Sequence, residues 1–284
     1  MKLRGKLIII GGAEDKGDSH DNETEFAEDG ILRRIVDESL HKEDSRIEIV
    51  TSASRIPHDV GDDYIKAFAK LKAKNTGYFV METREDAANP ENLARLEAAD
   101  VVFFTGGDQL RLTSILGGTP FYYLMYKKLE TEDFIYAGTS AGAAAASDNM
   151  VMRGSSTDAI TKGEVKTSAG FGLIEDVLFD THFIARGRIG RLFQLIVSNP
   201  KVLGVGLEEN SALLITSDYK MEAIGPGMCI LIDGRFIKNT NLLDIKEGVP
   251  LSIDNFILHV MSKTDVYDLK ERQLTIITPE ECRL

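Results

Sequence analysis

A serine stands at the centre of the pentapeptide GTSAG, residues 138–142, which follows a short apolar run at residues 134–137. The pattern Gly-x-Ser-x-Gly is typical of a nucleophile elbow, a sharp strand-to-helix turn that lifts the serine hydroxyl above the sheet. Small neighbours suit the strained backbone of such a turn. We therefore predict that Ser140 is a nucleophile and that the N–H of Ala141 faces an oxyanion.

A nucleophilic serine needs a general base, and histidine is the usual one. Among the five histidines, His182 stands apart because it ends an apolar run and precedes a turn that contains Arg186, Arg188 and Arg191. We predict His182 as the base. The other four have no comparable surroundings in the sequence: His20, His41, His58 and His259.

The acid that would orient the histidine is less clearly marked. Glu208 and Glu209 follow the strand-like residues 204–207, whose glycines let backbone and loop approach closely. Asp180 competes with them, because alternation along a strand would point it the same way as His182. That direction suits a substrate contact or a partner of the histidine, so the sequence leaves the alternatives open.

Two further groups of residues fit acyl transfer. Gly106 and Gly107 follow the apolar residues 101–105, and glycine N–H groups there could bind the oxyanion without a Cβ in the way. The three arginines after His182 suit an anion or carboxylate clamp, since guanidinium binds carboxylate in a bidentate manner. No histidine, carboxylate or cysteine spacing indicates a metal site, and we expect no cofactor.

The composition narrows the possible partners. The chain has 284 residues with 33 basic and 45 acidic side chains, a net charge of −12, which disfavours nucleic acid. Two cysteines, Cys229 and Cys282, do not form a disulfide framework. The first residues have too short an apolar core for a signal peptide, and no apolar stretch reaches the length of about 18 residues that a membrane span needs. We expect a cytoplasmic protein that does not bind membranes.

The elements that must position these residues alternate along the first half of the chain. Predicted strands cover residues 6–10, 46–51, 78–81, 101–105 and 134–137, and predicted helices cover residues 30–40, 54–74, 89–98, 109–116 and 119–129. The acidic run from residue 14 to residue 29 is predicted to be mainly a solvated loop. This order specifies an α/β fold with a mostly parallel, doubly wound sheet, in which ligands bind at the carboxyl ends of the strands.

Beyond residue 150 the pattern changes. Predicted strands lie at residues 178–183, 204–207, 212–216, 228–232 and 256–261, with one helix at residues 186–198. No linker divides the chain. We therefore expect a single domain, residues 1–284, in which a β-rich extension from about residue 220 packs on the same core.

Taken together, the motifs resemble those of the cyanophycinases, serine peptidases related to aspartyl dipeptidase. The motifs that carry the resemblance occur in order: GGAEDK at residues 11–16, GGDQ at 106–109, GTSAGA at 138–143, D-x-H-F with R-x-R-x-x-R at 180–191, and G-x-G-x-E-E at 204–209. The resemblance implies a class I glutamine-amidotransferase-like fold, a homodimer, and cleavage of cyanophycin, an arginine-bearing polyaspartate, to β-Asp-Arg dipeptides.

The resemblance also implies roles for individual residues. It makes Ser140 the nucleophile, His182 the base and Glu209 the orienting acid. Gly107 and Ala141 would supply the oxyanion N–H groups. The residues implied for the substrate pocket are Gln109, Asp180, Arg186, Arg188 and Arg191, with Asp180 on the substrate arginine and the arginines on its carboxylates. One departure concerns specificity, because Thr181 stands where the family pattern has glutamine.

Three other hypotheses compete with a cyanophycin-cleaving peptidase. An aspartyl or isoaspartyl dipeptidase of the same family would use the same site. An α/β-hydrolase esterase would have the order serine, acid, histidine, and so would need His259 as its base. A non-catalytic binding module on the same scaffold would leave Ser140 unreactive.

Overall fold

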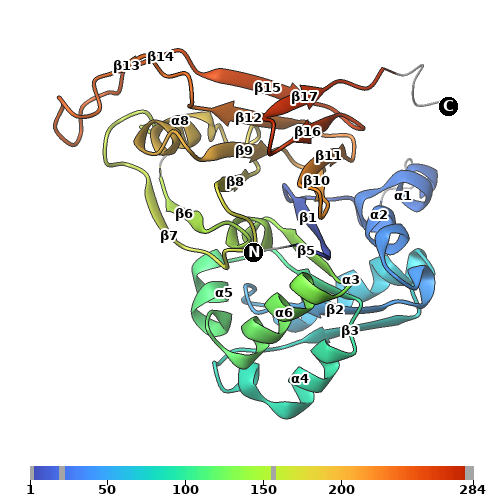
Figure 1. Ribbon diagram of the computed structural model, residues 1–284. Helices are drawn as coiled ribbons and strands as arrows, with labels where there is room; N and C mark the ends of the chain where they lie inside the picture. The colour runs from blue at the N-terminus through green and yellow to red at the C-terminus, as the bar shows by residue number, and fades with distance from the viewer. Residues whose placement is uncertain (1–2, 19–22, 155–157, 279–284) are drawn as a thin grey trace.

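The computed structural model describes residues 3–18, 23–154 and 158–278 (Figure 1), so His20 and Cys282 lie outside the described residues. A nine-stranded sheet forms its centre, in the order β17-β16-β11-β10-β1-β5-β4-β2-β3. Five of these strands pair in parallel: β1 (Lys6–Ile10), β5 (Ile135–Thr139), β4 (Val101–Phe104), β2 (Arg46–Val50) and β3 (Asn75–Phe79). This is the mostly parallel α/β sheet that the sequence predicts.

Helices cover both faces of the parallel strands. Ile8, Ile49 and Phe103 face one layer, made by α1 (Glu23–Asp29), α2 (Ile31–Glu38) and α3 (Pro57–Lys70). Ile9, Val102 and Phe104 face the other. The helices of that second layer are α4 (Pro90–Glu97), α5 (Gln109–Leu116), α6 (Pro120–Thr131) and α7 (Ala141–Ala145). Short 3-10 turns lie at Lys42–Asp44 and Asp86–Ala88.

The C-terminal part extends this sheet and adds a second one, seen in yellow to red at the top of Figure 1. Four antiparallel strands continue the central sheet beyond β1: β10 (Ala212–Ile215), β11 (Lys220–Ile224), β16 (Val266–Asp268) and β17 (Gln273–Thr275). The second sheet has the order β15-β12-β9-β8, with bounds Ile257–Met261, Cys229–Asp233, Leu203–Leu207 and Val177–Thr181. The strands after residue 220 thus contribute to both sheets.

The second sheet is itself covered on both faces. Phe179, Val205 and Leu231 join the core against the central sheet, while Leu178 and Ile232 pack under helix α8 (Ile189–Ser198). Two small hairpins complete the fold: β6 (Asn149–Arg153) with β7 (Lys166–Ala169), and β13 (Asn239–Thr240) with β14 (Ile253–Asp254). No helix in the described part of the chain is long and apolar enough to cross a bilayer.

Two predicted boundaries are wrong for a physical reason that bears on the site. The strand predicted to reach residue 183 ends at Thr181, because His182 has a φ of 50° and leaves the extended conformation. The helix predicted from residue 186 begins only at Ile189. The intervening turn carries Arg186 and Arg188.

Candidate active site

Ser140 occupies a strained turn between β5 and α7. Its φ and ψ are 49° and −100°, and its N–H donates to the carbonyl of Ile10 at 3.0 Å. The flanking glycines are required by close packing, since a Cβ at Gly138 would lie 2.6 Å from the backbone of Gly142, and one at Gly142 would lie 2.6 Å from Phe104. The geometry is that of the predicted nucleophile elbow.

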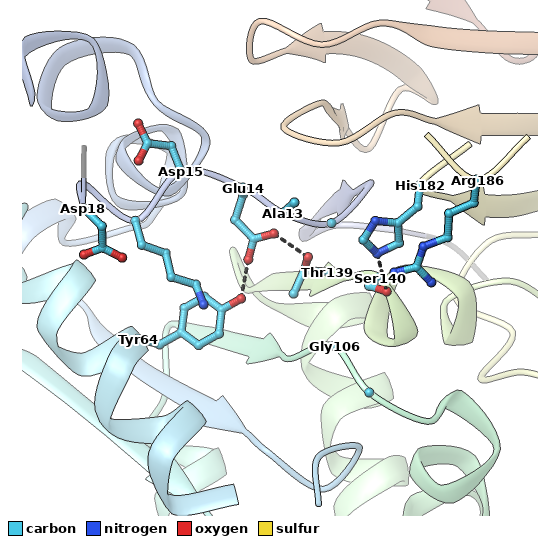
Figure 2. A pocket seen from close by; sticks show the side chains of 13 residues that line it. Ala13, Glu14, Asp15, Asp18, Tyr64, Gly106, Thr139, Ser140, His182 and Arg186 are labelled. Carbon is cyan, nitrogen blue, oxygen red and sulfur yellow. Dashed lines mark hydrogen bonds between the residues drawn. The ribbon is translucent and has the colours of Figure 1, made fainter. Parts of the chain in front are cut away.

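His182 bridges the serine and a carboxylate. Its Nε2 lies 3.1 Å from Ser140 Oγ and its Nδ1 lies 2.7 Å from Glu209 Oε1; Figure 2 shows the imidazole above the serine. A carboxylate only accepts hydrogen bonds, so Nδ1 carries the proton and Nε2 is free to accept from the hydroxyl. The three side chains therefore form a continuous Ser-His-Glu chain.

The two neighbouring glutamates have different partners. The Glu208 carboxylate accepts from the backbone N–H groups of Ile184 and Ala185, the latter at 3.2 Å, and so holds the turn after His182. Glu209 alone of the pair contacts the imidazole. Of the alternatives that the sequence leaves open, Glu209 is the one whose carboxylate contacts His182.

Gly107 and Ala141 are the residues predicted to supply the oxyanion N–H groups. Gly107 follows β4 with a φ of 141°, and a Cβ there would lie 2.2 Å from the carbonyl oxygen of Ala53. Gly106 passes against Ser140, with a built Cβ 3.4 Å from the serine Cβ. Ala141 begins α7, so its N–H has no acceptor within that helix. Gly107 lines the cavity beside Ser140, and the oxyanion role of the two N–H groups stays a prediction.

A cavity of about 640 Å³ opens beside Ser140 and His182. The loop after β1 supplies one wall with Glu14, Asp15 and Asp18, while Arg186 lies at the other end beside the serine (Figure 2). Of the five residues implied for substrate binding, Arg186 is the one that lines this cavity. The cavity therefore presents charges of both signs.

Asp180 does not face the cavity, which corrects its implied contact with a substrate arginine. Its side chain is 3% exposed and accepts from Arg191, including Nε at 2.9 Å, and from Arg188 Nη1 at 3.4 Å. The alternation argument fails because β8 ends at Thr181 and His182 turns away. Burial lowers the pKa of the Arg188 guanidinium, and Asp180 opposes that shift. Arg188 and Arg191 thus both donate to the carboxylate of Asp180.

Gln109 lies next to the site but not in the same cavity. It begins α5, and its Nε2 donates to the carbonyl of Val151 at 2.8 Å. It lines a second cavity that meets the first at Gly107.

Sequence reasoning missed a buried polar group beneath the elbow. Glu14, assigned to a solvated loop, is 5% exposed and accepts from Thr139 Oγ1 at 2.6 Å and from the Tyr64 hydroxyl. Burial and the nearby Glu14 carboxylate raise the pKa of Tyr64 well above its usual value, so the phenol stays protonated and donates. The available signal was position: Glu14 follows the carboxyl end of a buried strand.

Gly12 forms the floor under the histidine. Its φ is 103°, and a Cβ there would lie 2.4 Å from His182 Cε1. The carbonyl of Gly12 accepts from the N–H of Asn210 at 2.9 Å, and Asn210 Oδ1 accepts from the N–H of Asp15 at 3.1 Å. The loop after β1 is thereby tied to the loop that carries Glu209.

The chain was compared with known protein families, and the model of peptidase family S51 matches residues 7–222. The chain belongs to peptidase family S51. This confirms the resemblance drawn from the motifs.

Curated relatives of this S51 peptidase are cyanophycinases. That of Synechococcus elongatus is 34% identical over 272 residues, which cover 95% of this chain and 81% of the relative. That of Geminocystis herdmanii is 32% identical over 271 residues, covering 95% and 96%. The protein is thus a serine peptidase of the cyanophycinase-like type.

Solved structures share the S51 chain's fold. A peptidase from an acI-B1 Actinobacterium has a TM-score of 0.60 at 20% identity, covering 92% of this chain and 98% of that one. A putative peptidase E from Listeria monocytogenes has a TM-score of 0.52 at 15% identity, covering 78% and 98%.

The esterase alternative does not fit this S51 peptidase. His259 lies on β15 in the second sheet, and its ring packs against that of Tyr267 with centroids 5.6 Å apart. The histidine that contacts Ser140 is His182, which precedes the acid in sequence. That order differs from the serine, acid, histidine order of α/β-hydrolases.

Proposed function

We propose that the protein hydrolyses cyanophycin to β-Asp-Arg dipeptides through an acyl-enzyme formed on Ser140. The observation that carries the proposal is the hydrogen-bonded chain from Ser140 through His182 to Glu209. Relatives named cyanophycinase, 32–34% identical over most of the chain, support the choice of substrate. We further propose that residues 1–284 form one peptidase domain.

The mechanism follows from the roles of the three side chains. Ser140 Oγ attacks the scissile carbonyl while His182 Nε2 takes its proton, and Glu209 stabilises the imidazolium that forms. The N–H groups of Gly107 and Ala141 bind the oxyanion. His182 then gives its proton to the leaving amine. Water, deprotonated by His182 in the same way, attacks the acyl-enzyme and releases the acyl group from Ser140.

The charged walls of the cavity suit a zwitterionic unit. Each unit of cyanophycin carries a guanidinium and a free carboxylate. In this proposal Arg186, at one end of the cavity, binds the carboxylate, and Asp15 and Asp18, which line the cavity together with Lys16, bind the guanidinium. The Lys70 ammonium, which donates to Asp18, lowers the pKa of that carboxyl, so Asp18 is an anion near neutral pH.

Digestion of purified cyanophycin tests the function, with the products identified by mass. The wild type is expected to release β-Asp-Arg, and Ser140→Ala is expected to lose at least about 10³-fold in kcat. Ser168→Ala, a serine on β7 outside the triad, is the matched control and should retain activity. Full activity of Ser140→Ala would overturn the assignment of the nucleophile.

Two other outcomes separate the competing hypotheses. Turnover of Asp-X or isoaspartyl dipeptides without turnover of cyanophycin would assign the protein to the dipeptidase activity. Failure of Ser140 to react with a fluorophosphonate probe, together with no turnover of either substrate, would favour a non-catalytic binding module.

A further inference from the structure

A second cavity, of about 700 Å³, lies on the other side of Gly107 from Ser140. Its walls come from three places far apart in the sequence: the segment after β2, the start of α5 and the end of β6. The residues that the argument uses are Arg55, Asp108, Leu110, Met152 and Arg153. Gly107 lines both cavities, so a ligand chain that crosses the oxyanion position can enter both.

Two arginines of this cavity have no partner for their charge among the residues that the structure describes. Arg55 and Arg153 are exposed, and within the described part of the chain neither guanidinium has a hydrogen bond or an ion pair. Their neighbour Arg111 differs, because it donates to the carbonyl of Ser52 at 3.0 Å and lies 3.7 Å from Glu82. In a chain of net charge −12, two unpaired arginines lining one cavity favour an anionic ligand.

The carboxylate of the same cavity is already engaged. Asp108 caps α5, and its Oδ1 accepts from the N–H groups of Leu110 and Arg111 at 2.9 and 3.1 Å. Among the described residues it forms no ion pair with Arg55 or Arg153. Apolar contacts come from Leu110 and Met152, which are 40% and 42% exposed. The cavity thus offers two cations, the capping carboxylate of Asp108 and a small apolar surface, and its net positive charge suits a carboxylate borne on a peptide chain.

The position of His182 indicates which part of the substrate, relative to the scissile bond, this cavity would bind. In serine peptidases the histidine protonates the leaving amine, so the leaving group lies on the histidine side. His182 and Arg186 line the first cavity and neither lines the second. The acyl part of the substrate then extends away from His182, across Gly107.

We propose that Arg55 and Arg153 form an anion subsite that binds a carboxylate of the substrate chain on the acyl side of the scissile bond. The direction of the chain rests on the proposed function, whereas the preference for an anion rests on the cavity alone. Neither arginine lines the cavity that contains Ser140 and His182, so the proposal assigns them to substrate binding and not to the chemical step.

Binding of fluorescein-labelled hexa-aspartate to the Ser140→Ala protein, followed by fluorescence anisotropy, tests the subsite directly. Arg55→Gln and Arg153→Gln should each weaken binding about three- to fivefold, as expected for exposed charge pairs, and the double variant about tenfold or more. The double variant should also show a weaker dependence of Kd on salt. Arg4→Gln is the matched control, because Arg4 is exposed and precedes the amino end of β1, whereas Arg55 follows the carboxyl end of β2.

The second readout is the kinetics of cyanophycin cleavage, measured with proteins that retain Ser140. The double variant should raise KM about tenfold and leave kcat within about twofold, with an unchanged thermal unfolding midpoint. Unchanged KM and unchanged hexa-aspartate binding would overturn the subsite while the peptidase function stands. A wild type that does not cleave cyanophycin would remove the proposed function, and the binding assay would still decide whether Arg55 and Arg153 hold a carboxylate.

Discussion

The carboxylate of Glu14 accepts a 2.6 Å hydrogen bond from the hydroxyl of Thr139, the residue immediately before Ser140. The other carboxylate oxygen accepts from Tyr64, so a buried acid ties the loop after β1 to the end of β5 and to α3. Because the same loop carries Gly12 under His182, this network holds the base and the nucleophile against each other.

Removing the Tyr64 hydroxyl tests the contribution of this network to stability. Tyr64→Phe leaves an oxygen of the buried Glu14 carboxylate without its donor, and the free energy of unfolding should fall by about 1–3 kcal/mol in urea denaturation. The control is Tyr123→Phe, since Tyr123 is 64% exposed and should change stability by less than about 0.5 kcal/mol. Equal stability of the two variants would show that the network contributes nothing.

Exchange of each paired glutamate for glutamine separates their roles. Glu209→Gln removes the charge that stabilises the His182 imidazolium, so kcat on cyanophycin should fall by about 10³- to 10⁴-fold with little change in KM. Glu208→Gln keeps an oxygen that can accept from Ile184 and Ala185, and kcat should stay within about tenfold of wild type. If Glu208→Gln is the more damaging of the two, Glu209 is not the orienting acid.

Asp180 should matter for folding more than for contact with substrate. Asp180→Asn leaves the buried Arg191 without its counter-charge and should cost about 3–5 kcal/mol of stability, measured by denaturant unfolding. Asp37→Asn breaks the more exposed pair with Arg33 and should cost less than about 1 kcal/mol.

A second substitution distinguishes the loss of that ion pair from a general packing defect. Combining Asp180→Asn with Arg191→Met also removes the charge of Arg191, the more buried of the two arginines that contact Asp180, so part of the lost stability should return. No recovery in the double variant would mean that the buried charge is not the cause.

Cys229 should make stability fall at alkaline pH. Burial raises the pKa of its thiol from 9.0 to about 12. Between these values the unfolded chain loses a proton that the folded chain keeps, so the unfolded state gains stability as pH rises. At pH 10 this contribution amounts to about 1 kcal/mol.

Cys229→Ala should remove that contribution. In a Cys282→Ser background, the loss of unfolding free energy between pH 8 and pH 10 should be about 1 kcal/mol smaller in Cys229→Ala than in its parent. Identical losses in both proteins would show that the thiol titrates alike in the folded and unfolded chains.

The sequence predicts the parallel sheet and the positions of Ser140 and His182 after its strands, because both depend on local patterns. Each buried strand is a short apolar run, and the elbow, Gly107 and His182 each follow such a run directly. The residues that follow the carboxyl ends of neighbouring parallel strands lie together at the same end of the sheet. Glu209 needed the resemblance, since spacing alone did not separate it from Glu208.

The rest depends on contacts that no local pattern records. Glu14 is acidic and stands in an acidic run, so only its tertiary partners, Tyr64 and Thr139, reveal that it is buried. Asp180 appeared to share a direction with His182 until the positive φ of His182 broke the alternation. The short strands β11, β16 and β17 were missed because pairing across the sheet defines them more than composition does.

The missing side chain of Gly12 has a consequence for the interpretation of other sequences. The His182 ring occupies the space that any larger residue at this position would need. A homologue could keep the serine, the histidine and the glutamate and still be a pseudoenzyme, if alanine replaced this one glycine. The size of an uncharged position, about 170 residues from the base in sequence and in contact with it in space, is therefore a criterion for activity that a search for catalytic residues overlooks.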